Sequence, residues 1–233
     1  MENVVDSPVA VATEPPASER SVAPRPRAAV FDLFDLVSGG PIAEERVGGA
    51  HTLQVALRAF AASVGFAALY GAAAGCTSPV LVWQNALKLP MVVILAVVCS
   101  LPLGSLVWKV MGQPSRWSDL VMSVATGLFT ATLVLACGAP LIALYYLTTE
   151  HVGGALVALF VALATFVGIA NGIRAGLRRR VHGTPILSVV TPLGALAGAM
   201  LAALVQLVHL ASPIIPERTV FDDGVEGIVS RPW

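Results

Sequence analysis

The chain has 233 residues, of which 56% are hydrophobic and only 12% are charged. Ordinary soluble domains carry about a quarter charged residues, so this composition excludes a typical soluble globular protein. Basic and acidic residues number 14 each, and the zero formal net charge gives no indication of nucleic acid or of an acidic partner. The composition favours a chain surrounded by hydrocarbon, and the uneven placement of its charges becomes the main source of information.

The N-terminal part of the chain divides into two segments. Residues 1–27 are rich in proline, serine, alanine and charge, which predicts a disordered cytoplasmic tail and no signal peptide. Residues 28–52 form a predicted amphipathic juxtamembrane segment, because Phe31, Phe34 and Val37 recur at helical spacing before Gly39 and Gly40. The alternative for this second segment is a loosely ordered stretch ahead of the first membrane span.

Residues 53–212 form the predicted transmembrane domain. Five apolar runs of about the 20 residues that cross a bilayer follow one another. They are Leu53–Ala74, Leu89–Val107, Leu120–Leu147, Val152–Ile173 and Ile186–Ala211. The sequence therefore predicts an all-α, polytopic bundle of five transmembrane helices, followed by a tail at residues 213–233.

The third run is longer than one crossing requires. At 1.5 Å per residue it would measure about 42 Å, against roughly 30 Å of hydrocarbon. Pro140 interrupts it, so we expect a kink there, or a spanning helix followed by a short interfacial segment. Pro102 and Pro192 are predicted to break the second and fifth spans, either as bends and packing features or as part of a binding site.

Arginine placement predicts how the chain is threaded. Basic residues in short loops stay in the cytoplasm. The loop after the fourth span is the most basic one, and the loop after the second span agrees with it; together they supply Arg174, Arg178, Arg179, Arg180, Lys109 and Arg116. This predicts a cytoplasmic N-terminus and an extracytoplasmic C-terminus. The same basic residues are candidates for contact with anionic lipid or with a protein partner.

Lys88 precedes the second apolar run and is predicted to anchor it at the membrane interface. Pro90 would then lie in the first helical turn, where its missing N–H costs nothing. A binding role for Lys88 is the alternative. Trp83, Trp108 and Trp117 also fall near predicted span ends, as an aromatic belt requires.

Small residues recur every four positions in three of the predicted spans. In lipid, helices associate through close packing of such residues. The predicted packing residues are Gly71, Gly75, Ala164, Gly168, Gly172, Gly176, Gly194 and Gly198. We expect them to hold the five helices together, with a homodimer through the fourth span as the alternative.

No catalytic, cofactor-binding or metal-binding motif is recognisable, so we predict no catalytic residue, no cofactor and no metal. Glu150, His151 and His209 could meet on the extracytoplasmic face, but solvated loop residues are the favoured interpretation. The three cysteines at 76, 99 and 137 are expected to be buried and inert.

The stretch "ALKLPMVVILAVVCSLPLG" carries a Lys-x-Pro followed by a Leu-Pro further along the same span. It resembles a family of small, largely uncharacterised bacterial polytopic membrane proteins, which implies a place in a bacterial inner membrane. The five-span arrangement is also similar to the Yip1 superfamily, which implies a role in membrane organisation and trafficking. The resemblance implies no individual functional residue.

Two functions are consistent with these features. The first is a non-enzymatic accessory or organising subunit of a membrane assembly, because packing glycines are abundant and charge is absent from the span centres. Its partners would be the bilayer, another membrane protein or a second copy of this chain. The alternative is a small permease or channel whose proline-broken helices line the pathway.

Overall fold

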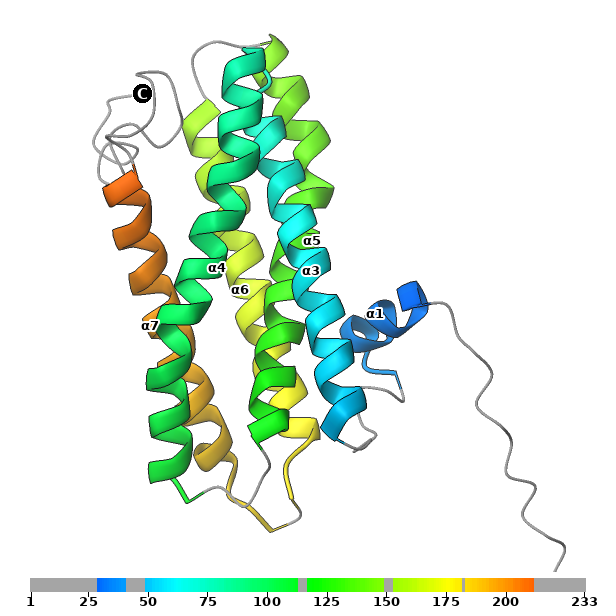
Figure 1. Cartoon of the computed structure of the whole chain (residues 1–233), viewed down its shortest axis with the longest axis vertical. Coiled ribbons are helices and arrows are strands. Elements are labelled where there is room, and N and C mark those ends of the chain that lie inside the picture. Colours follow the sequence, from blue (N-terminus) through cyan, green and yellow to red (C-terminus); the bar gives the residue numbers. More distant parts are fainter. Residues whose placement is uncertain (1–28, 41–48, 113–116, 149–152, 182, 212–233) are drawn as a thin grey trace, which may run out of the picture.

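The computed structural model describes residues 29–40, 49–112, 117–148, 153–181 and 183–211. Over these ranges all the regular secondary structure is helical, and six helices form an elongated bundle (Figure 1). They are α1 (Ala29–Ser38), α3 (Gly49–Ala74), α4 (Pro79–Val110), α5 (Trp117–Thr148), α6 (Gly153–Arg178) and α7 (Ile186–Ala211). Within the described residues, α3 to α7 are each long and apolar enough to cross a membrane. The predictions for the two tails, residues 1–27 and 213–233, lie outside the described residues.

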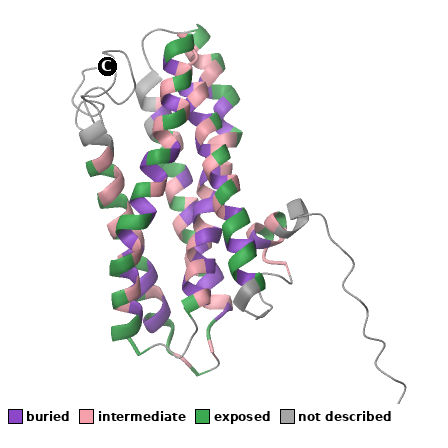
Figure 2. Cartoon of the chain, viewed as in Figure 1, coloured by how far each residue is buried: buried purple, intermediate pink, exposed green. Residues whose placement is uncertain are grey.

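The five long helices form two groups. In the first, α5 packs extensively on both α6 and α3; in the second, α4 packs on α7, and the two helices cross in the view of Figure 1. In the most apolar 18-residue stretch of α5, 50% is buried inside the protein, whereas the corresponding stretch of α6 is only 22% buried. The helix α5 is therefore the central one (Figure 2). The groups join where α3 meets α4 and, less extensively, where α6 meets α7.

The start of α4 corrects the predicted second span. We expected the span to begin at Leu89 with Pro90 in its first turn, but the helix begins at Pro79, and Pro90 is buried inside it. Ser78 has extended backbone and precedes Pro79 at the first helical position, where a proline is tolerated. Hydropathy missed the added turns because they carry polar side chains, although a helix satisfies its own backbone groups whatever its side chains are.

The prolines do not interrupt their helices. The helices α4, α5 and α7 continue through Pro102, Pro140 and Pro192, so none of these prolines ends its helix, and a break in that sense is wrong. Bends or packing roles at Pro102 and Pro192 stay predictions. The separate interfacial segment considered after Pro140 is also absent, because α5 is continuous to Thr148. A bend at Pro140 stays a prediction.

Most of the predicted packing residues lie at close helix contacts. Gly71 and Gly75 lie against the backbone of α4 at Asn85 and Leu81. Gly168 and Gly172 lie against α5, where a Cβ atom at Gly168 would come within 2.8 Å of the Gly127 carbonyl oxygen. These glycines therefore allow the backbones to approach, as packing in lipid requires.

The four remaining predicted packing positions have different outcomes. Ala164 is buried, and Gly176 lies against Leu193 and Val189 of α7. Gly194 and Gly198 are exposed, and nothing in the described structure lies within 4 Å of a Cβ added to either. Their predicted role in holding this chain together is therefore wrong, because that face of α7 points away from the other helices.

The predicted juxtamembrane segment contains a helix, α1, that packs on the bundle. Leu36 is buried in a cluster with Val55 of α3 and with Met122 and Phe129 of α5. Gly39 follows α1 with a φ of 80°, a left-handed conformation that glycine adopts without a Cβ clash, and this ends the helix. The apolar face of α1 thus meets protein.

Candidate functional site

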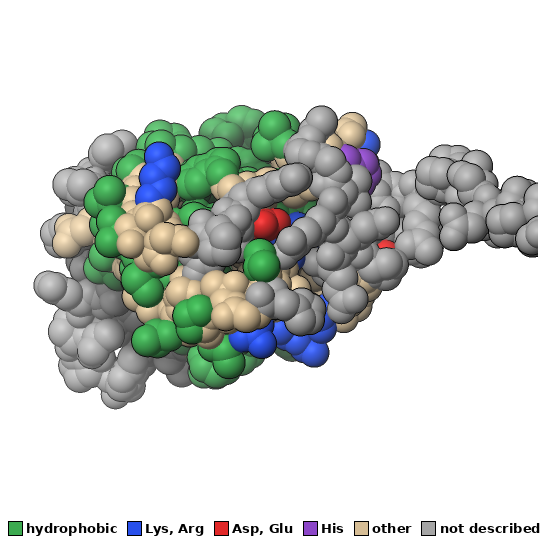
Figure 3. Space-filling view, turned by 90° about the horizontal axis from the view of Figure 1, so that it is seen from below, with side chains coloured by type: hydrophobic (Ala, Val, Ile, Leu, Met, Phe, Trp, Pro, Cys, Tyr) green, Lys and Arg blue, Asp and Glu red, His purple; other side chains and the backbone are tan. Residues whose placement is uncertain are grey.

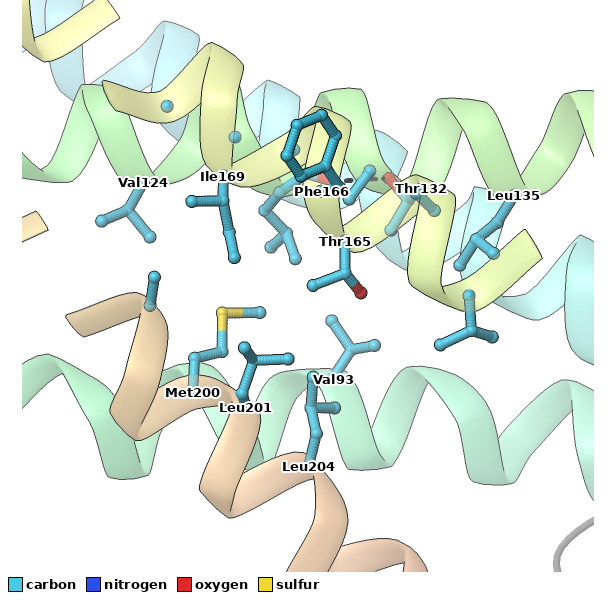
Figure 4. A pocket seen from close by; sticks show the side chains of 18 of the residues that line it. Val93, Val124, Thr132, Leu135, Thr165, Phe166, Ile169, Met200, Leu201 and Leu204 are labelled. Carbon is cyan, nitrogen blue, oxygen red and sulfur yellow. Dashed lines mark hydrogen bonds between the residues drawn. The ribbon is translucent and has the colours of Figure 1, made fainter. Parts of the chain in front are cut away.

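A cleft of about 620 Å³ lies between the two helix groups. Its walls come from α4, α5, α6 and α7, together with Tyr70 of α3. Val124 and Ile169 point into this space from one side, and Met200, Leu201 and Leu204 point into it from α7 (Figure 4). The cleft exists because α4 and α7 pack on each other, whereas α5 packs on α3 and α6.

The lining of the cleft is apolar and carries no charged side chain. Its hydroxyl groups belong to Tyr70, Ser123, Thr132 and Thr165. Ser123 Oγ donates to the Asp119 carbonyl at 2.7 Å, and Thr132 Oγ1 donates to the Leu128 carbonyl at 3.0 Å. Helix carbonyls of the chain thus satisfy these hydroxyls, so the walls offer little to water.

Thr165 and Tyr70 are the remaining polar groups of the lining. The Thr165 hydroxyl points into the cleft (Figure 4). Tyr70 is buried, and its Oη donates to the Val157 carbonyl at 3.4 Å, which ties α3 to α6. A site of this kind, mainly apolar with a few placed polar groups, is typical of a small-molecule pocket.

The cleft reaches the lateral surface of the bundle. Val161 and Phe166 on α6, and Leu201 and Val205 on α7, line the cleft and are also exposed. In a bilayer, this surface meets acyl chains. A hydrocarbon chain could therefore enter between α6 and α7 without crossing water.

Three polar side chains with buried atoms lie at the end of the bundle where α4 begins and α5 ends (Figure 1). We call Gln84, Asn85 and Tyr146 the polar cluster. Asn85 is only 2% exposed. Within the described part of the chain, three buried atoms have no hydrogen-bond partner: Asn85 Oδ1, Gln84 Oε1 and Tyr146 Oη. Buried polar groups normally have a partner, so these three require an explanation.

Lys88 lies beside the polar cluster, inside α4. It is the tenth residue of that helix, about 14 Å from its first residue at 1.5 Å per residue. Its Nζ is buried, so the expected position at the mouth of the helix is wrong. Because α4 is much longer than one crossing, a position at the hydrocarbon boundary remains compatible with this depth, and the anchor interpretation stays a prediction.

The tryptophans have separate environments. Trp83 and Trp117 are exposed near the first residues of α4 and α5, where an aromatic belt residue is expected. Trp108 is 5% exposed and packs with Leu120 and Val189. The prediction that Trp108 anchors the protein at the interface is wrong, because its indole faces α5 and α7.

Some of the basic residues expected to meet lipid or a partner instead contact the protein itself. Arg179 is buried, and its Nη1 lies 3.8 Å from Asp119 Oδ1 at the start of α5. Arg178 places its guanidinium against Gly39, next to α1. Arg179 is therefore a structural residue of the bundle.

The other basic positions remain at the surface where they are described. The exposed ones are Lys109, Arg174 and Arg180. Basic side chains lie at separate places on the end of the bundle that Figure 3 shows from below. We call this the arginine end; α4 and α6 end there, and α5 and α7 begin there. Arg116 lies outside the described residues.

No group of three or more histidine, cysteine or acidic residues that could hold a metal occurs within the described ranges. Glu150 and His151 lie outside those ranges and the side chain of His209 is not described, so the weak site considered there stays untested. Cys99 and Cys137 are exposed, which corrects the expectation that all cysteines are buried; Cys76 Sγ lies 3.6 Å from the Ala143 carbonyl oxygen.

Comparison with known proteins gives no relative. No family model, no curated protein and no solved structure matches the chain. The resemblance to the Yip1 superfamily therefore has no support beyond the features of the sequence.

Among these features, the cleft and the polar cluster are the ones that sequence reasoning missed. The cleft depends on which helices pair, and periodicity carries no signal for it. Asn85 and Gln84 were visible as polar residues beside an apolar run, but a shorter predicted span placed them in a loop.

Proposed function

We propose that the protein is a non-enzymatic accessory protein of a membrane assembly that holds a hydrocarbon chain in the cleft between α4–α7 and α5–α6. The observation that carries this proposal is the cleft of about 620 Å³ with an uncharged, largely apolar lining. Its lateral opening between exposed residues of α6 and α7 supports entry from the bilayer.

The size of the cleft favours a chain over a protein segment. A helix of 10 Å diameter and 1.5 Å rise fills about 120 Å³ per residue, so the cleft would take only about five residues of one. A water molecule takes about 30 Å³ and a methylene group is of similar size, so the cleft takes on the order of 20 such groups. That capacity suits an acyl or alkyl chain.

The same lining disfavours the permease or channel alternative for ions and polar solutes. Such a pathway needs ionisable or hydrogen-bonding groups near the membrane centre. The hydroxyls of Ser123 and Thr132 donate to helix carbonyls, and the other lining groups are mostly aliphatic. The geometry therefore favours binding of a hydrocarbon chain.

The proposal includes an orientation and partners. The described basic residues of the loops lie at the arginine end, which the positive-inside rule assigns to the cytoplasm of a bacterial inner membrane. Exposed Arg174 and Arg180 would there meet anionic lipid. The outward face of α7 with Gly194 and Gly198 would receive a membrane-protein partner or a second copy of this chain.

The experiment compares two alanines of α7. Ala197 lines the cleft, whereas Ala202 is exposed and does not line it. Ala197→Phe should fill the cleft and reduce labelling by a photoactivatable alkyl probe in nanodiscs, while Ala202→Phe should label like the wild type. Equal labelling of both variants, with saturable labelling of the wild type, would place the probe elsewhere and refute the proposal.

A further inference from the structure

The polar cluster is costly in the described structure. An unsatisfied buried amide or hydroxyl loses its hydrogen bonds to water without replacement. Asn85 Oδ1, Gln84 Oε1 and Tyr146 Oη all have this character, and they belong to neighbouring positions of α4 and to α5. Such an arrangement is expected where a ligand supplies the missing partners.

The polar cluster is continuous with the cleft. Asn85 lies one helical turn, about 6 Å, from Leu89 on the same face of α4, and Leu89 lines the cleft. Tyr146 and Leu89 both pack against the buried group that contains Tyr70, another lining residue. Gly71, next to Tyr70, lies against the Asn85 backbone and brings α3 to the same place.

The depth of the polar cluster is that of a membrane boundary. α4 has 32 residues, and at 1.5 Å per residue its length of about 48 Å exceeds the hydrocarbon core by about 18 Å. A centred bilayer would therefore begin about 9 Å from each end of α4, which is the distance from Pro79 to Asn85 at that rise. The cleft extends from this depth toward the membrane centre.

We propose that the polar cluster binds the uncharged, hydroxyl-bearing head of a single-chain amphiphile whose hydrocarbon chain occupies the cleft. This inference rests on the proposed function and adds the chemistry of the head. A long-chain alcohol or a monoacylglycerol has this chemistry: its hydroxyl groups both donate and accept, which matches carboxamide oxygens and a phenol.

The groups that remain for a ligand are neutral. Lys88 lies one turn from Gln84, but it already engages in an interaction within the protein. The polar cluster itself consists of two carboxamides and a phenol, which form hydrogen bonds but do not neutralise a full charge. A buried charged head would lack a counter-ion, and its desolvation would oppose binding.

The test measures the affinity of hexadecanol, hexadecane and palmitate in nanodiscs by competition with the alkyl probe. The wild type should bind hexadecanol about tenfold more tightly than hexadecane, as one or two buried hydrogen bonds allow. Tyr146→Phe, which removes one hydroxyl, and Asn85→Leu should each reduce this preference to about twofold or threefold. Thr148→Val, at an exposed position near the end of α5, is the matched control and should keep the full preference.

Three other outcomes would contradict, respectively, the head site, its neutral character and the chain site. Equal affinity of the wild type for hexadecanol and hexadecane overturns the head site but leaves the chain site of the proposed function intact. Palmitate binding tighter than hexadecanol shows that the head is anionic and overturns the neutral assignment. Saturable binding of none of the three molecules means that the cleft is no chain site, and both proposals fail.

Discussion

Removal of Arg179 should destabilise the bundle, although the residue lies in a run of arginines that resembles a solvated loop. Its Nη1 is 3.8 Å from Asp119 Oδ1, and both side chains are largely buried. At an effective dielectric constant of about 20, two unit charges at that separation attract by about 4 kcal/mol. Desolvation of both groups offsets part of this attraction, so the pair itself adds less to the stability of the fold.

Arg179→Ala leaves the Asp119 carboxylate buried without this counter-ion. Breaking a buried pair in this way costs about 3–5 kcal/mol in the free energy of unfolding. The double variant Asp119→Leu/Arg179→Met removes both charges and should recover most of that loss, because paired replacement by apolar residues is often neutral.

The assay is reversible denaturant unfolding of the purified protein in mild detergent. Arg180→Ala is the matched control, since Arg180 is the next residue and is exposed; it should change the free energy of unfolding by about 0.5 kcal/mol or less. If Arg179→Ala and Arg180→Ala unfold at the same denaturant concentration, the buried pair does not connect α5 to the end of α6, and the reasoning is refuted.

Two further predictions concern packing. Gly168→Val should separate α5 from α6, because a Cβ there would lie 2.7 Å from Ala131 Cβ. We expect the free energy of unfolding to fall by about 1–3 kcal/mol. Equal stability of Gly198→Val and Gly168→Val would contradict the α5–α6 contact. Leu36→Ala should loosen α1 by about 2 kcal/mol and expose it to added proteinase K, whose specificity is broad, whereas Phe34→Ala, at a position 54% exposed, should not. Identical digestion of these two variants would show that α1 does not pack through Leu36.

The five apolar helices and the helical nature of α1 could be predicted from the sequence, because length, apolar composition and 3.6-residue spacing are local properties. The start of α4 could not be predicted in this way. Hydropathy treats Asn85 and Lys88 as the end of a span, whereas the helix continues and places Asn85 against α3. At these positions the polar side chains indicate the end of a span, whereas the backbone stays helical and packs on α3. The contact with α3 is a tertiary feature that local polarity does not report.

The partners of individual residues also depend on tertiary packing. The spacing of Gly168 and Gly172 on α6 looks the same in sequence as that of Gly194 and Gly198 on α7, yet only the α6 pair meets another helix. Likewise, Arg179 and Arg180 are neighbours in one basic run, but the end of α6 directs Arg179 toward Asp119 and leaves Arg180 exposed. Repeats and charge runs identify candidate positions, and the pairing of helices selects among them.

The central claim is that the cleft is dry and opens to hydrocarbon. Its most direct test is electron paramagnetic resonance of a spin label at Ala197→Cys in a bilayer, with the three native cysteines replaced and Ala202→Cys as the lipid-facing reference. We predict frequent collisions with oxygen and few with a water-soluble nickel chelate at both positions. Access of the nickel chelate to position 197, with position 202 still protected, would reveal a water-filled pathway and contradict the proposed hydrocarbon site.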